Sequence, residues 1–255
     1  MNIALEYIKY RLNAKGRHGI HSPFVYGLVD KCMQIHISSE DEATLKKVKK
    51  SFNDDSRIIE VEDFGAGSKK MGSKRTVKQL FKTSSSNGKF GRFFYQLSNF
   101  YQPKNSLEFG TSIGIGSVHF AIGSPSSNVT TIEACKETYS IATANFRANQ
   151  LKNIESIHST FNDYLDSKPS QQFDLIFIDG HHDGTALLDY LERLQPNYHD
   201  QTIILVDDIR WSDSMFEAWN KLVSSNQFNV SIDFFRMGML VPRSGQMKEH
   251  FVLKM

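Results

Sequence analysis

Cysteine is scarce in this chain of 255 residues, and long apolar runs are absent from it. The two cysteines, Cys32 and Cys135, lie far apart and lack C-x-x-C spacing, which argues against a disulfide framework and a cysteine-ligated zinc site. No stretch approaches the roughly 18 apolar residues that span a membrane. The first residues also lack the continuous apolar core of a signal peptide. We therefore expect a cytoplasmic protein without a membrane span.

Acidic residues are missing between Asp63 and Glu108, whereas lysine and arginine recur there. The basic residues are Lys69, Lys70, Lys74, Arg75, Lys78, Lys82, Lys89, Arg92 and Lys104. This composition predicts a mobile basic segment over residues 68–104, with short helices at 76–81 and 90–100. The segment could hold an anionic substrate or a nucleic acid, or it could be a solubilising surface. The net charge of +2 does not decide between these alternatives.

A glycine-rich stretch at residues 106–117 is the strongest local signal in the chain. Its apolar start predicts a buried strand, its glycines allow close backbone approach to a ligand, and Ser117 begins a helix. The glycines are Gly110, Gly114 and Gly116. A glycine turn that leads into a helix is where α/β proteins hold nucleotides. The dinucleotide pattern G-x-G-x-x-G is incomplete here, because His119 stands in place of its last glycine.

Apolar and helical stretches alternate after Pro103, which predicts an α/β fold with a mostly parallel sheet. The expected strands are 107–109, 129–132, 154–157, 173–178 and 202–206. The expected helices between them are 117–122, 136–151, 161–165, 184–194 and 213–223. Three strand-like runs close the chain at 229–235, 239–241 and 250–253, and at least one of them should pair antiparallel.

The N-terminal part is expected to be helical. Periodic apolar residues predict helices at 2–12 and 40–55, and Ser22 is placed to cap a helix that begins at Pro23. His18 and His21 flank that cap and are more simply explained by a solvent-facing turn than by a metal site. Residues 1–103 are therefore predicted to form a helical extension or substrate cap.

Carboxylates follow three of the predicted strands. Glu133 ends the second strand and could accept both hydroxyls of a ribose, a role that NAD sites and methyltransferases share. Asp179 ends the fourth strand, and Asp207 and Asp208 end the fifth. If these strand ends are neighbours, their oxygens are suitable ligands for a hard divalent cation.

The pattern E-x-G-x-x-x-G-x-G that starts at Glu108 resembles motif I of class I S-adenosylmethionine-dependent methyltransferases. This resemblance implies a Rossmann-like three-layer domain over residues 104–255, with a mostly parallel seven-stranded sheet and an antiparallel strand at the C-terminal end. It also implies that the turn wraps the methionine part of the cofactor. The residues expected at the cofactor are Glu108, Gly110, Thr111, Ser112, Gly114, Gly116, Glu133, Ser159 and Asp179.

The strand-end carboxylates resemble those of metal-dependent O-methyltransferases typified by catechol O-methyltransferase. The resemblance implies that Asp179, Asp207 and Asp208 bind Mg²⁺ or Ca²⁺, although Asp208 stands where that family has asparagine. His182 occupies the position of the family's lysine base, so His182 and Asp179 are the expected catalytic residues, and a histidine can do this work. Trp211 could wall a substrate pocket, whereas Trp219 is expected in the core.

These observations predict a methyltransferase that acts on an oxygen of a small molecule, with divalent-metal assistance. Methylation of RNA or another anionic acceptor is one alternative, and a non-catalytic cofactor-binding protein is another. Residues 179–182 read Asp-Gly-His-His rather than N/D-P-P-[YF], which argues against N-methylation of adenine. A homodimer stays open as a further expectation.

Overall fold

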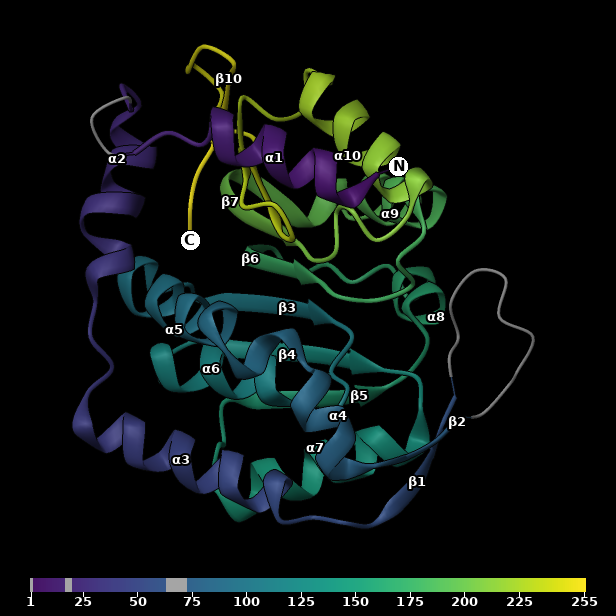
Figure 1. Cartoon of the computed structure of the whole chain (residues 1–255). Coiled ribbons are helices and arrows are strands. Elements are labelled where there is room, and N and C mark those ends of the chain that lie inside the picture. The colour runs from purple at the N-terminus through teal and green to yellow at the C-terminus, as the bar shows by residue number, and fades with distance from the viewer. Residues whose placement is uncertain (1, 17–19, 63–72) are drawn as a thin grey trace.

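The computed structural model describes residues 2–16, 20–62 and 73–255, and their centre is an eight-stranded sheet (Figure 1). Its strand order is β10-β8-β9-β7-β6-β3-β4-β5. The strands are β3 (Asn105–Phe109), β4 (Asn128–Glu133), β5 (Ile154–His158), β6 (Phe173–Ile178), β7 (Tyr198–Val206), β8 (Val230–Asp233), β9 (Gly238–Val241) and β10 (Glu249–Val252).

The pairing directions of the strands follow the predicted α/β pattern. Strands β3 to β7 pair parallel, whereas β9 pairs antiparallel with both β7 and β8. The eighth strand, β10, pairs parallel with β8 and extends the sheet beyond the seven strands expected. Because β3 lies between β4 and β6, the chain reverses its direction of winding at β3, and ligands bind at the carboxyl ends of strands at such a point.

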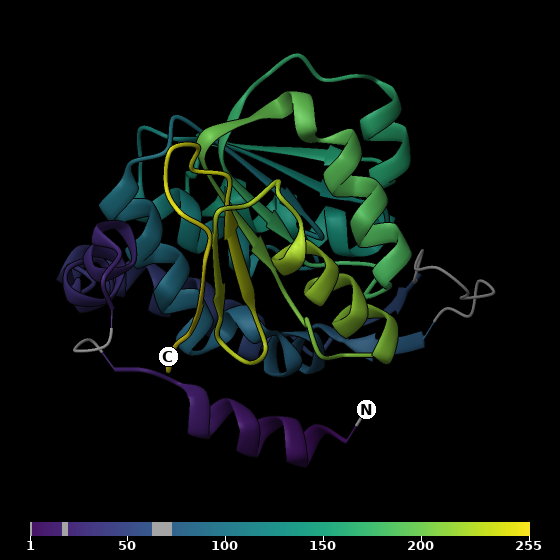
Figure 2. The same ribbon diagram turned by 90° about the horizontal axis from the view of Figure 1, so that it is seen from above.

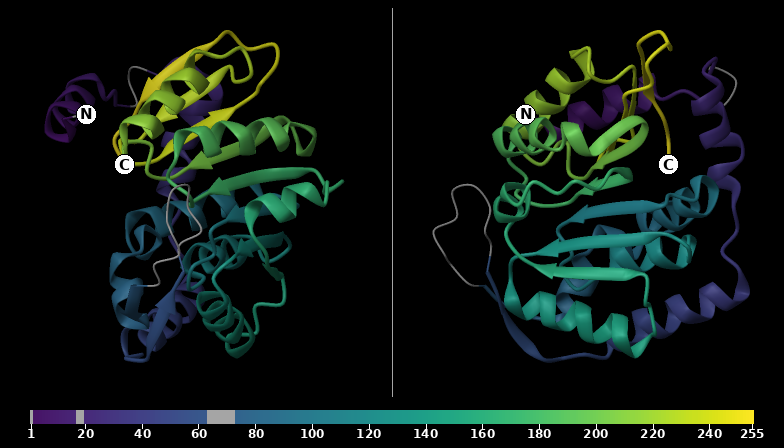
Figure 3. Two further views of the ribbon diagram at one scale, coloured as in Figure 1. Left: turned by 90° about the vertical axis from the view of Figure 1, so that its right-hand side faces the viewer. Right: turned by 180° about the vertical axis from the view of Figure 1, so that it is seen from behind.

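Alternate side chains of β6 are buried against opposite layers, as expected of a strand covered on both faces. Phe177 packs with Phe94 and Phe120 in one cluster, whereas Ile176 and Ile178 belong to the other. The first layer contains α5 (Lys89–Tyr101), α6 (Ile115–Gly123) and α7 (Lys136–Ala148). The second contains α8 (Phe161–Asp166), α9 (Gly184–Arg193) and α10 (Asp213–Ser224), seen from further sides in Figure 3.

The expectation of a mobile basic segment is wrong for its described part, residues 73–104, but the short helices expected at 76–81 and 90–100 are confirmed. This part forms β2 (Ser73–Thr76), α4 (Val77–Thr83), a short 3₁₀ turn and α5. Helix α5 is fixed on the sheet because its aromatic side chains Phe93 and Phe94 are buried in the core. Strand β2 pairs antiparallel with β1 (Ile58–Val61), a hairpin that its polar residues do not signal. Lys69 and Lys70 lie outside the described residues.

The N-terminal helices are α1 (Ile3–Asn13), α2 (Pro23–Asp30) and α3 (Ser39–Asn53), close to their predicted ranges. Ser22 precedes α2 as expected, but its hydroxyl accepts a hydrogen bond from Gln246 Nε2 (3.0 Å) instead of capping the helix. His21 is exposed, and His18 lies outside the described residues. No helix in the described part of the chain has the length and apolarity needed to cross a membrane.

Helix α1 lies apart from the two helical layers, on the outside of the C-terminal part of the sheet (Figures 2 and 3). It is attached near its C-terminal end, where the Tyr10 hydroxyl donates to the carbonyl of Leu253 (2.6 Å). The Lys15 N–H donates to the carbonyl of Val252 (2.8 Å). Tyr7 and Tyr10 also pack their rings on Phe235, with centroids 5.0 and 5.2 Å away. The helix therefore covers the end of β8.

Candidate active site

The glycine turn connects β3 to α6 in a backbone conformation that requires glycine. Gly110 has φ +100° and Gly114 has φ +90°. A Cβ at Gly110 would lie 1.8 Å from the carbonyl oxygen of Asp179. The Asp179 N–H in turn donates to the carbonyl of Phe109 (2.8 Å). The turn is therefore packed directly against the end of β6.

Glu108 lies beneath this turn and is 1 % exposed. Its Oε2 accepts hydrogen bonds from Thr131 Oγ1 (2.7 Å) and from the Ser117 hydroxyl. A Cβ at Gly116 would lie 2.3 Å from Glu108 Oε1, so the absence of that atom makes room for the carboxyl. Burial raises the pKa of Glu108 to about 7. Glu108 therefore supports the turn from inside, and so does buried Thr111, whose hydroxyl lies 2.6 Å from that of Thr131.

Glu133 is located at the end of β4, beside the outer side of the turn. Its Oε2 accepts the N–H of Ser112 (2.7 Å), and its Oε1 accepts the N–H of Cys135 (2.8 Å). Each oxygen keeps a further lone pair for a ligand. Burial raises the pKa of this carboxyl. Ser159, at the end of neighbouring β5, donates its N–H to the Glu133 carbonyl (3.1 Å), so the predicted cofactor residues of both strands lie together.

Two consecutive histidines follow β6 in unusual conformations, with φ +61° at His181 and φ +32° at His182. His181 hydrogen-bonds through Nδ1 with the Tyr190 hydroxyl, which gives it a structural role. His182 Nε2 lies 3.8 Å from Asp208 Oδ2, and its ring lies 5.6 Å from that of Trp211. Its Nδ1 is buried and has no hydrogen-bond partner within the described ranges. A purely structural histidine normally has such a nitrogen satisfied.

Asp179 lies between the turn and the acidic end of β7. Burial raises its pKa, and the negative charges of Asp207 and Asp208 raise it further. The site therefore disfavours a third negative charge, and a bound cation would stabilise it.

Arg236, in the loop between β8 and β9, contacts both acidic residues at the end of β7. Its Nε lies 3.2 Å from Asp207 Oδ1 and 2.9 Å from Asp208 Oδ1. Its Nη2 lies 3.2 Å from Asp207 Oδ2 and 3.1 Å from Asp208 Oδ2. Every oxygen of the two carboxylates therefore contacts one guanidinium.

The expected metal-ligand set of Asp179, Asp207 and Asp208 does not form. Within residues 2–16, 20–62 and 73–255, no group of three acidic, histidine or cysteine side chains is arranged to hold a metal ion. The physical reason is Arg236, whose charge-assisted bonds use the oxygens that a hard cation would need. The donor set thus fits an arginine rather than Mg²⁺ or Ca²⁺.

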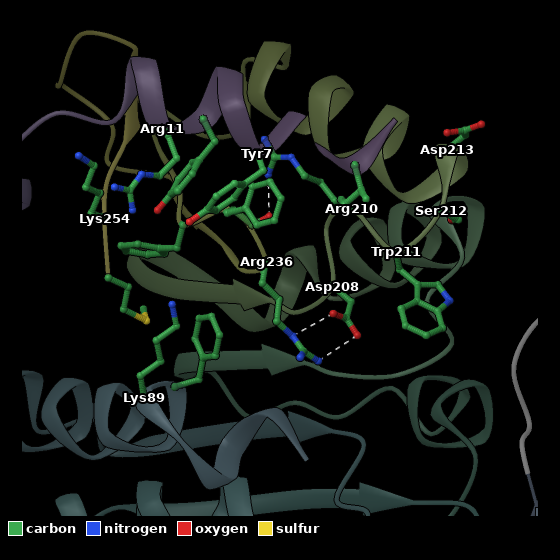
Figure 4. A pocket seen from close by; sticks show the side chains of 16 residues that line it. Tyr7, Arg11, Lys89, Asp208, Arg210, Trp211, Ser212, Asp213, Arg236 and Lys254 are labelled. Carbon is green, nitrogen blue, oxygen red and sulfur yellow. Dashed lines mark hydrogen bonds and ion pairs between the residues drawn. The ribbon is translucent and has the colours of Figure 1, made fainter. Parts of the chain in front are cut away.

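A cavity of about 670 Å³ begins at Asp208 and Arg236 and continues beneath α1 (Figure 4). Aromatic side chains and basic side chains form much of its wall. The lining includes Tyr7, Arg11, Lys89, Phe90, Trp211, Phe235 and Lys254. Trp211 is 69 % exposed and lines the cavity as expected, whereas Trp219 is 1 % exposed in the core.

Residues 107–209 match a family described as a methyltransferase domain. These residues form a methyltransferase domain. The predicted α/β fold class and the predicted enzyme class, an S-adenosylmethionine-dependent methyltransferase, are thereby confirmed. The matched residues contain the glycine turn, Glu133, both histidines and the acidic end of β7.

Solved structures share the fold of this methyltransferase at low sequence identity. An O-methyltransferase from Bacillus cereus, in complex with S-adenosylhomocysteine, is 18 % identical with a TM-score of 0.54, covering 84 % of this chain and 94 % of its own. An S-adenosylhomocysteine-bound methyltransferase from Podospora anserina is 14 % identical with a TM-score of 0.59, covering 90 % and 97 %. A Geobacter sulfurreducens methyltransferase is 16 % identical with a TM-score of 0.51, covering 86 % and 96 %.

Sequence reasoning missed two parts of this candidate site. Arg236 follows two phenylalanines in a C-terminal loop, where nothing in the local pattern marks it as functional. The contribution of α1 to the cavity is equally invisible locally, because Tyr7 and Phe235 are brought together only by the fold. The carboxylates at the strand ends indicate from the sequence that a positively charged group lies near them, and Arg236 is that group.

Proposed function

We propose that this protein transfers a methyl group from S-adenosylmethionine to an oxygen of a small molecule bound in the cavity beneath α1. The observation that carries the proposal is the position of the loop after β6. Asp179 packs on the glycine turn, while His182, three residues later, contacts Asp208 and Trp211 of the cavity wall. The loop after β6 thus connects the glycine turn to a cavity that is large enough for a small-molecule acceptor.

The residues around the turn suit the proposed methyl donor. Glu133 has lone pairs available for the ribose hydroxyls, and the Gly110–Gly114 turn allows close backbone approach. Burial raises the pKa of Asp179 and the neighbouring carboxylates raise it further, so a cationic ligand would stabilise the ionised form of this side chain. Ser159 adds a polar side chain at the neighbouring strand end. We assign Glu108 and Thr111 to positioning the turn rather than touching the donor.

When bound beside Glu133 and the glycine turn, the donor would supply a methyl group on a positively charged sulfur that would keep the C–S bonding pair on leaving. His182 Nε2 accepts the proton of the acceptor hydroxyl, so that the oxygen attacks as it loses that proton. Asp208, 3.8 Å away, stabilises the imidazolium that results. Helix α1 and Trp211 hold the acceptor and exclude water, which is the role that we propose for the N-terminal extension as a cap.

Divalent-metal assistance is not part of this proposal, because Arg236 already engages Asp207 and Asp208. Methylation of RNA and a homodimer stay predictions from the sequence, whereas the methyltransferase match argues against the non-catalytic alternative. The relatives described as O-methyltransferases support oxygen as the acceptor atom.

Transfer can be measured directly with methyl-labelled S-adenosylmethionine and a panel of phenols, catechols and hydroxy acids. The proposal predicts labelled product with at least one hydroxyl acceptor and loss of that product in His182→Ala. Label that appears only on RNA would favour the RNA alternative, and no transfer to any hydroxyl acceptor despite donor binding would contradict the proposal.

A further inference from the structure

The guanidinium of Arg236 has one amino group left over after its contacts with the acidic end of β7. Its Nε and Nη2 bind Asp207 and Asp208, whereas Nη1 meets no acceptor within the described part of the chain. The Arg236 side chain is 39 % exposed and lines the cavity. Figure 4 shows it beside Asp208, between the two ends of the cavity. Two N–H donors are therefore available where an acceptor would bind.

Arg236 also supplies a permanent positive charge. Burial alone lowers the pKa of this guanidinium, but Asp207 and Asp208 raise it by more, so the group remains charged. The three side chains together carry one negative charge. A divalent cation would have to displace a planar, multiply bonded guanidinium from both carboxylates, which makes the pair a poor site for it.

We propose that Arg236 takes the place of a divalent cation in this enzyme, balancing Asp207 and Asp208 and donating from Nη1 to the acceptor oxygen. The proposal rests on the proposed methyl transfer. The acceptor oxygen becomes more negative as His182 removes its proton, and a fixed donor directed at that oxygen stabilises the developing charge without moving.

Electron paramagnetic resonance can measure the binding of Mn²⁺ in the presence of S-adenosylhomocysteine. This experiment tests the proposal and does not require the acceptor to be known. The wild-type protein should leave Mn²⁺ free at micromolar concentrations. Arg236→Met should create a Mn²⁺ site, because Asp207 and Asp208 lose their counter-charge, with an affinity gain of about tenfold or more. Arg193→Met is the matched control, since Arg193 bridges Asp166 and Asp189 on the outside of α9.

One tightly bound Mn²⁺ in the wild-type protein would overturn the proposal, and this measurement does not depend on how a variant folds. An Arg236→Met protein that folds but binds no more Mn²⁺ than Arg193→Met would also overturn it. Failure of the methyltransferase proposal is distinguishable, because it would show as absent S-adenosylhomocysteine binding in a separate titration.

The far end of the cavity supports a second, independent inference. Arg11, Lys89 and Lys254 gather there, away from Trp211 (Figure 4). None of these three has a carboxylate within ion-pair distance in the described ranges. The wall between the two ends is aromatic, with Phe90 and Phe235. By contrast, Arg210 at the same wall is neutralised by Asp233, with Nη2 and Oδ2 2.6 Å apart.

The geometry points to an aromatic acceptor that carries an anionic group at the end opposite its reacting hydroxyl. The aromatic walls provide apolar and ring contacts for its skeleton. The three cations provide charge-assisted hydrogen bonds for its anionic group. This inference names the acceptor class of the proposed function.

Two fluorescent probes that differ only by a sulfonate, anilinonaphthalenesulfonate and phenylnaphthylamine, test this class. The sulfonate probe should bind about tenfold more tightly, and Arg11→Gln combined with Lys254→Gln should remove most of the difference. Lys9→Gln is the matched control on α1, because Lys9 is paired with Glu6 (2.8 Å) and does not line the cavity. Equal binding of the two probes, or a preference that survives the double substitution, would overturn the inference.

Discussion

His182 Nε2 lies 3.8 Å from Asp208 Oδ2, at the boundary between the glycine turn and the cavity. The pair joins the ends of two neighbouring strands, β6 and β7. Both residues have positive φ, at +32° and +52°, a conformation that costs energy in residues other than glycine. Such strain is kept where the surrounding fold imposes it, and here it directs a histidine and a carboxylate toward each other.

Replacing His182 with alanine should lower kcat about a hundredfold, because the acceptor hydroxyl loses its proton acceptor. Affinity for S-adenosylhomocysteine should stay within about twofold, since His182 is not among the residues at the turn. Steady-state kinetics and a binding titration measure the two effects separately. His199→Gln is the control: His199 Nε2 pairs with Asp174 (3.0 Å) at the opposite end of β6 and β7. Equal kinetics of the two variants would exclude His182 as the base.

Replacing Glu108 with glutamine should flatten the pH dependence of stability. The folded pKa of about 7 exceeds the ordinary value of 4.5, so folding favours the protonated carboxyl. The stability that Glu108 contributes is fully present below about pH 4.5 and is lost as pH rises to about 7. As pH rises from about 5 to about 8, the free energy of unfolding of Glu108→Gln should therefore increase by roughly 3 kcal/mol relative to that of the wild type.

Urea denaturation at the two pH values measures this gain. Glu192→Gln, at an exposed position of α9, should show no comparable change. A constant difference between wild type and Glu108→Gln across the range would show that Glu108 is ionised without cost in the folded protein.

Replacing Gly110 with alanine should destabilise the fold by more than about 2 kcal/mol. Its φ of +100° disfavours a side chain, and the new Cβ would collide with the Asp179 carbonyl. Gly27→Ala is the control, because Gly27 lies within α2 with open space around its Cβ position. That change should stabilise the protein by roughly 0.5 to 1 kcal/mol. Thermal or urea unfolding should show that Gly110→Ala is less stable than the wild type and that Gly27→Ala is more stable.

Most of the methyltransferase fold could be predicted from the sequence because its strands are short apolar runs that are followed by charged or polar residues. The apolar run from Phe173 to Ile178 indicates a buried strand, and Asp179 marks its carboxyl end. The acidic pair after Val206 marks the carboxyl end of the next strand in the same way. The strand β2 could not be predicted, since Ser73 to Thr76 are polar and become a strand only by pairing with β1.

The site was predictable only where its parts are local. The Glu108 motif and Glu133 belong to single strand–turn–helix units, so their spacing carries the information. Arg236 reaches Asp207 across 29 positions of sequence, through a hairpin whose geometry no local pattern specifies. The same limit explains the metal prediction: the carboxylates were visible in the sequence, but the arginine that pairs with them was not.

Calorimetric titration with S-adenosylhomocysteine and, separately, with NAD shows which nucleotide the glycine turn holds. S-adenosylhomocysteine should bind with one site per chain, and NAD should not bind. Glu133→Ala should weaken the binding by about tenfold or more, as expected for lost hydrogen bonds to a charged group. Glu155→Gln, an exposed change on adjacent β5, should leave it unaltered. Binding of NAD without binding of S-adenosylhomocysteine would show that the glycine turn holds a dinucleotide instead of a methyl donor.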